Sequence, residues 1–179
     1  MFDKVALNIA SWIKQQNPEQ TASVAVMQFA LIGLLNSALV FFIVITIGAV
    51  TGHFVNSLIA SVFFVGLHFF SGGYHFKSAL YCTLFSSSMI IASILIPLNS
   101  TWLLIVTIIT FVIVAIFAPS NIENHARIPK KYFPILKVVS LCVVSVNLFL
   151  QSGSAGFAML FQAMLLLPYH KLTSNKEVK

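Results

Sequence analysis

Six long apolar stretches dominate the hydrophobic pattern of the chain. They cover residues 22–50, 54–70, 79–97, 102–118, 135–151 and 156–168. A helix needs about 20 apolar residues to cross the hydrocarbon core of a bilayer, whereas a membrane β-barrel would show alternating segments of about ten residues. The pattern therefore predicts an all-α fold, a polytopic membrane helical bundle of about six transmembrane segments.

The first and last stretches differ most from the usual span length. Residues 22–50 are long enough to tilt or to extend into the interface, and residues 156–168 either borrow flanking residues or form a re-entrant segment. Ahead of them, residues 2–16 predict an amphipathic helix. Its apolar side chains recur at helical spacing: Phe2, Val5, Ile9, Trp12 and Ile13. We expect this helix to lie in the membrane interface, although a simple cytosolic lead-in to the first span fits the same residues.

Composition excludes an ordinary soluble domain. Hydrophobic residues make up 59% of the 179 residues and charged residues 8%, against about 25% charged in soluble domains. The mean hydropathy is +0.97. Residues 1–20 show no cleavable signal pattern. Without internal repeats, residues 1–179 form one membrane domain, in which an amphipathic segment (1–20) precedes the bundle (21–170) and a basic tail (171–179).

All ten basic residues fall on one side of a six-span arrangement. They precede the first span, lie in the second and fourth connections, open the fifth span or follow the sixth: Lys4, Lys14, Lys77, Arg127, Lys130, Lys131, Lys137, Lys171, Lys176 and Lys179. By the positive-inside rule, both termini are expected in the cytoplasm. The net charge of +6 therefore sets topology, and we expect no nucleic-acid partner.

Ionisable and polar residues within the spans are few. The four acids lie outside the apolar stretches: Asp3, Glu19, Glu123 and Glu177. This argues against a proton-coupled pump, and without a His-Glu-x-x-His motif we expect no metal and no cofactor. Scattered amides are expected to join helices: Gln28, Asn36, Asn56, Asn147 and Gln162.

Candidate chemistry is concentrated around the second connection. It contains Gly72, Gly73 and His75, and Cys82 follows seven residues after the histidine. A cysteine nucleophile reacts as the thiolate and needs a base or a positive local potential. In a continuous helix, the two side chains would be about 10 Å apart along the axis. A proton transfer therefore requires the chain before the helix to fold back, for which the glycine pair supplies the freedom.

Neighbouring residues support the same hypothesis. Ser78 is a candidate N-cap, which places Cys82 about one turn into the helix. The helix N-terminus and Lys77 would both favour its thiolate. Ser86, one turn further on the same face, is a candidate for lining the site, although helix packing is an alternative role for it.

A purely structural interpretation fits the same residues. A cysteine near a helix end is commonly a small buried hydrophobe, and a histidine in a membrane loop is often interfacial. Cys142 lies within an apolar stretch with no base nearby, so we expect it to serve structural packing. Neither cysteine fits a disulfide framework.

Two motifs nevertheless point to a known family. The stretch from Ser71 to Cys82 contains Gly-Gly-Tyr-His and then the cysteine, and Ala118-Pro119 leads into a polar loop with basic residues. This pattern resembles the accessory gene regulator B (AgrB) family. Members are membrane-embedded cysteine endopeptidases of bacterial quorum sensing that cut a small AgrD-like precursor on its C-terminal side.

The resemblance implies roles for specific residues. Cys82 would be the nucleophile and His75 the general base. A thiol or hydroxyl of the peptide would then resolve the acyl-enzyme thioester and close a thiolactone or lactone ring. Family members often carry an arginine before the glycine pair, where His68 is the nearest residue here. Packing is the simpler role for that histidine, and a dyad without a carboxylate is simpler than one in which Glu123 orients His75.

The resemblance also implies location and partners. The protein would reside in the bacterial cell membrane with its active site on the cytoplasmic side, and would contact membrane lipids and the AgrD-like precursor. A homodimer suits a bundle of this size. The alternative is a non-enzymatic six-helix membrane component, such as the substrate-binding subunit of a transporter, which would have no need of a thiol.

Overall fold

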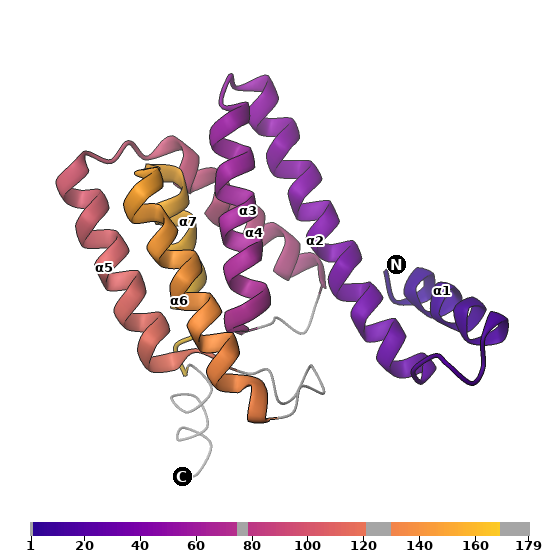
Figure 1. Cartoon of the computed structure of the whole chain (residues 1–179). Helices are drawn as coiled ribbons and strands as arrows, with labels where there is room; N and C mark the ends of the chain where they lie inside the picture. Colours follow the sequence, from indigo (N-terminus) through magenta and orange to yellow (C-terminus); the bar gives the residue numbers. More distant parts are fainter. Residues whose placement is uncertain (1, 75–78, 121–129, 169–179) are drawn as a thin grey trace, which may run out of the picture.

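The structure, a computed structural model, describes residues 2–74, 79–120 and 130–168, and its regular elements there are all helices (Figure 1). They are α1 (Phe2–Gln16), α2 (Val24–Val50), α3 (Phe54–Ser71), α4 (Ala79–Leu95), α5 (Ser100–Phe117), the 3-10 turn η1 (Lys130–Tyr132), α6 (Phe133–Leu150) and α7 (Gly153–Met164). The predicted all-α class is confirmed. Each apolar stretch corresponds to one helix.

Polar side chains between the apolar stretches start the helices. Ser23 Oγ accepts a hydrogen bond from the Val26 N–H at the start of α2. Asn99 caps α5 in the same way, with 2.9 Å between its Oδ1 and Trp102 N, and Ser152 caps α7. These bonds satisfy N–H groups that have no acceptor within their own helix. The boundaries of the apolar stretches therefore lie within four residues of the helix ends.

Helix length separates the long spans from the short ones. Four helical segments in the described part of the chain are long and apolar enough to cross a membrane: α2, α3, α5 and Lys130–Leu150, which joins η1 to α6. α4 is a shorter apolar helix. α7 has 12 residues and is therefore only about 18 Å long, well below the roughly 30 Å of a hydrocarbon core. The last predicted stretch is thus the shortest helix of the bundle.

α7 lies in the middle of the bundle despite its shortness. It contacts α3, α4, α5 and α6 (Figure 1), and most of its residues are buried: Ser154, Ala155, Gly156, Ala158, Met159, Gln162 and Ala163. A Cβ added to Gly156 would lie 2.9 Å from Leu103 Cδ1 of α5. Small residues allow this close approach, on which helix association in membranes depends.

Two groups of buried side chains form the core, and α7 contributes to both. One group joins α3, α5, α6 and α7 through Leu67, Val114, Val144 and Met159. The other joins α2, α3, α4 and α7 and includes Phe64, Ile90 and Ala158. The position of α4 relative to α3 is therefore set in part through α7.

α1 packs along the first half of α2 at one side of the bundle (Figure 1). Ala6 and Ala10 are fully buried, while the predicted apolar stripe remains exposed at Val5, Ile9 and Trp12. The amphipathic helix is thus confirmed, with its small residues toward the protein and its large apolar residues outward. Its interfacial location remains a prediction.

One end of the bundle gathers the ends of three helices. α3, α5 and α7 all end there. Tyr74, which follows α3, is hydrogen-bonded to Leu165 at the end of α7, and Ser120, which follows α5, is hydrogen-bonded to Ser71 at the end of α3. We call this the loop end of the bundle. α6 begins at the same end, after Lys130 and Lys131 (Figure 1). The orientation of the loop end relative to the membrane remains a prediction.

The α2–α3 hairpin offers a test of this packing. A Cβ on Gly48 would overlap the Ser57 side chain, at 1.8 Å from Oγ and 2.5 Å from Cβ, whereas a Cβ on Gly33 of the same helix meets nothing within 4 Å. We expect Gly48→Ala to destabilise the protein by about 1–3 kcal/mol through overpacking and Gly33→Ala to leave it unchanged. Thermal unfolding in detergent measures both. Equal stability of the two variants would contradict the packing described here.

Candidate functional site

Cys82 lies in the first turn of α4, which begins at Ala79. Its side chain is half-buried and forms no disulfide. The two residues before it, Leu80 and Tyr81, are exposed, and Thr83 after it is buried. Cys82 therefore lies at the border between the packed and the exposed face of α4, where a thiol can be reached by another molecule.

The packed face of α4 is fixed to its neighbours close to this cysteine. Thr83 Oγ1 donates a hydrogen bond to Asn36 Oδ1 of α2, with 2.5 Å between the two oxygens. Ser86, which follows Cys82 by one turn, is buried. Residues four apart lie on the same face of a helix, so Ser86 lies beneath the cysteine. A role in lining the site remains a prediction for it.

The chain leaves α3 through the two glycines singled out from the sequence. Gly72 has φ 69° and ψ −150°, and Gly73 has φ 143°. Both conformations disfavour residues with a side chain, because a Cβ would clash with the backbone. The two glycines therefore adopt backbone conformations that turn the chain at the loop end, as predicted.

Ser120 holds this turn from one side. The Gly73 N–H donates to the Ser120 carbonyl at 3.0 Å, and the Ser120 N–H donates to the Ser71 carbonyl at 2.9 Å. The two segments thus form a short parallel bridge, directly after the cis peptide between Ala118 and Pro119. The two motifs that carried the family resemblance are far apart in sequence, and the fold brings them together.

α7 holds the same turn from the other side. The Tyr74 N–H donates to the Leu165 carbonyl at 2.9 Å. Gln162 Nε2 donates to the Gly72 carbonyl at 2.8 Å, and Gln162 Oε1 lies 3.1 Å from His68 Nδ1. An amide oxygen can only accept, so this contact is a hydrogen bond in the tautomer of His68 that carries its proton on Nδ1. We call these two side-chain hydrogen bonds the Gln162 clamp.

Amides in the spans behave largely as predicted. Four of the five join separate elements: Gln28 bonds to α1, Asn36 to α4, Asn147 to α5 and Gln162 to the end of α3. The contact of Gln162 with the candidate site was not predicted from the sequence. The available signal was a long amide within the shortest apolar stretch. His68, expected to pack, is half-buried and engaged by this amide.

Several predicted site residues lie outside the part of the chain that the structure describes. These are His75, Lys77 and Ser78, together with Glu123. The pairing of His75 with Cys82 therefore remains a prediction. Both flanks of that stretch are nevertheless connected to one helix, because Tyr74 is bonded to the end of α7 and α4 packs against α7.

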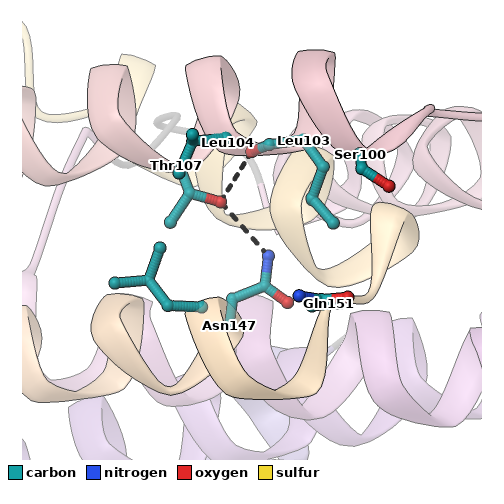
Figure 2. A pocket seen from close by; sticks show the side chains of 7 residues that line it. Ser100, Leu103, Leu104, Thr107, Asn147 and Gln151 are labelled. Atoms are coloured by element: carbon teal, nitrogen blue, oxygen red, sulfur yellow. Dashed lines mark hydrogen bonds between the residues drawn. The ribbon is translucent and has the colours of Figure 1, made fainter.

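A small pocket lies at the opposite end of the bundle, between the start of α5 and the end of α6 (Figure 2). Its volume is about 60 Å³, and its lining comprises Ser100, Leu103, Leu104, Thr107, Asn147, Leu148 and Gln151. Asn147 Nδ2 donates to Thr107 Oγ1 across it. Ligand sites usually measure about 300–1,000 Å³. This pocket is too small for a peptide.

Cys142 corrects one expectation. It was expected to serve structural packing, but its side chain is exposed on the outside of α6. In a membrane bundle that surface faces lipid, which is as apolar as a protein core. The sequence pattern of an apolar helix cannot separate these two environments.

The whole chain was also compared with known proteins. The sequence matches the model of the family described as AgrB, Accessory gene regulator B, over residues 6–167. A curated AgrB-like protein of Halalkalibacterium halodurans is 29% identical over 106 residues, which cover 58% of this chain and 54% of the relative. The match thus spans about half the length of that relative. No solved structure matches. Because the family model covers most of the chain, the protein belongs to the accessory gene regulator B family.

Proposed function

We propose that the protein is a membrane-embedded cysteine endopeptidase that cleaves an AgrD-like pro-peptide on its C-terminal side and promotes cyclisation of the product. One observation carries this proposal. A half-buried cysteine outside any disulfide, Cys82, lies in the first turn of α4, and the Gly72–Gly73 turn that precedes His75 in the sequence is held by hydrogen bonds on both sides.

The first chemical step is acylation of Cys82. Its thiolate attacks the scissile carbonyl, and the thiol proton passes to His75, which then delivers it to the departing amine. N–H groups in the first turn of a helix have no acceptor within it, so those of α4 are suited to stabilise the oxyanion. The helix N-terminus and Lys77 are proposed to favour the thiolate, with Ser78 as the proposed N-cap.

The second step is resolution of the thioester. A thiol or hydroxyl within the bound peptide attacks the acyl carbon, the bond to Cys82 breaks, and a thiolactone or lactone ring closes. Proximity makes this intramolecular attack fast. A site from which water is largely excluded suppresses the competing hydrolysis. The product is a cyclic peptide, and the enzyme thiol is regenerated.

Topology completes the proposal. Six segments cross or enter the bacterial cell membrane, with the short α7 enclosed by its neighbours. The loop end faces the cytoplasm with both termini, because Lys130, Lys131 and Lys137 lie at or near that end. A newly made precursor would meet Cys82 there, and its leader would lie on the same membrane surface.

The nucleophile and base can be tested with the two cysteines as a matched pair. In liposomes containing the AgrD-like precursor encoded beside the gene, Cys82→Ala and His75→Ala should lower tail release by a factor on the order of 10³ or more, because each removes a reacting group. Intact-mass spectrometry follows the released tail. Cys142→Ala should cleave like the wild type, because that thiol faces outward on α6.

A covalent peptide adduct on Cys82 would identify the acyl-enzyme directly. Cleavage by Cys82→Ala at the wild-type rate would overturn the mechanism. If the wild type binds its precursor but never cuts it, the non-enzymatic binding subunit becomes the better account.

Orientation can be tested with single cysteines in a background lacking Cys82 and Cys142. Gln16→Cys precedes the first span and Thr101→Cys lies at the start of α5, and both positions are exposed. We expect a membrane-impermeant maleimide added to intact cells to label Thr101→Cys only, with labelling of Gln16→Cys appearing after lysis. The reverse pattern would invert the topology and place the site outside the cell.

A further inference from the structure

Within the described helix α7, Gln162 is the only fully buried side-chain amide. It contacts both the last turn of α3 and the residue that follows this helix. Its nitrogen is bonded to the Gly72 carbonyl and its oxygen to His68 Nδ1. The Gly72 carbonyl can only accept, so a flip of the amide would break the bond to Gly72. A single side chain thus links the last turn of α3 to the peptide that follows it.

The contact leaves little space between the turn and the amide. A Cβ added to Gly73 would lie 3.2 Å from Gln162 Nε2 and 3.5 Å from the Leu165 carbonyl oxygen. The Tyr74 N–H is bonded to that same carbonyl. The backbone of residues 72–74 therefore lies directly on the end of α7, and Gln162 and Leu165 determine where it runs.

α7 also fixes the helix that carries the thiol. Ile90 of α4 is fully buried in the same core group as Ala158 of α7, and Cys82 lies two turns before that isoleucine on the same helix. The backbone that precedes His75 and the helix that carries Cys82 therefore both pack against α7. A shift of the turn on α7 changes the separation between the two.

We propose that Gln162 is a positioning residue, whose clamp on Gly72 and His68 sets the peptide preceding His75 at the distance from Cys82 that catalysis requires. This inference rests on the proposed function of Cys82 and His75. Displacements of about 1 Å in a catalytic constellation can cost about 100-fold in rate. Loss of the clamp should thus act on turnover more than on substrate binding.

A merely structural role for Gln162 makes a different prediction, and Asn147 serves as the matched control. Asn147 is also a buried amide with two hydrogen bonds, to Thr107 Oγ1 and from the Ser152 N–H. It lies near the opposite end of the bundle, beside the pocket of Figure 2. Removing either amide should destabilise the bundle, but only Gln162 contacts the turn.

The experiment compares Gln162→Met with Asn147→Leu, which are both close in shape to the original residues. Each full-length variant is purified in detergent for thermal unfolding and for hydrogen exchange of the Gly73 and Tyr74 amides, and reconstituted in liposomes for precursor cleavage. We expect Gln162→Met to lower kcat roughly 10- to 100-fold with KM within about twofold, and to speed exchange at both amides. Asn147→Leu should change neither kcat nor the exchange of the Gly73 and Tyr74 amides.

The outcomes separate this inference from the proposed function. Wild-type kcat in Gln162→Met, or equal losses of kcat in both variants, would overturn the positioning role. Unchanged exchange at Gly73 and Tyr74 would overturn the clamp itself, whether or not the protein is a peptidase. If Gln162→Met fails to fold, Gln162→Asn retains the amide on a shorter side chain and should give the same loss of kcat. Failure of the proposed function would show instead as cleavage by Cys82→Ala.

Discussion

Buried backbone polar groups must find partners within the protein, and this constraint shapes the loop end of the bundle. In hydrocarbon, an unsatisfied N–H or C=O costs several kcal/mol, so non-helical backbone survives only where the protein itself satisfies it. The turn after α3 meets the requirement with Ser120, Leu165 and Gln162. Its glycines can then depart from helical geometry without leaving polar groups unpaired.

The shortness of α7 follows from the same constraint. The last carbonyl groups of a helix accept no hydrogen bond from within that helix. The carbonyl of Leu165, the C-cap residue of α7, instead accepts a hydrogen bond from the Tyr74 N–H. A longer helix would use that carbonyl internally and would occupy the space of the turn. The small residues of α7, such as Gly156, let four neighbours close around it. A short, enclosed helix therefore serves as the base on which the turn and α4 are both placed.

The sequence predicted the elements well because capping residues such as Ser23, Asn99 and Ser152 separate the apolar stretches. It also indicated the glycine turn, since positive φ values require that residue type. The contacts of Ser120 and Gln162 could not be predicted from the sequence, because they join residues far apart in the chain and depend on how the helices pack. The outward position of Cys142 was missed for a different reason. Lipid and core are equally apolar, so hydropathy cannot distinguish them.

Backbone groups, the Ser71 hydroxyl and the neutral amide of Gln162 all form hydrogen bonds at this turn. A buried carboxylate would carry a large desolvation cost in this environment, whereas amide hydrogen bonds between helices cost little and contribute about 1 kcal/mol each. For the proposed base, His75, orientation through the backbone that carries it avoids the desolvation cost of a buried carboxylate. It follows that a dyad built this way depends on packing geometry, and the helix that supplies the geometry can matter as much as the residues that react.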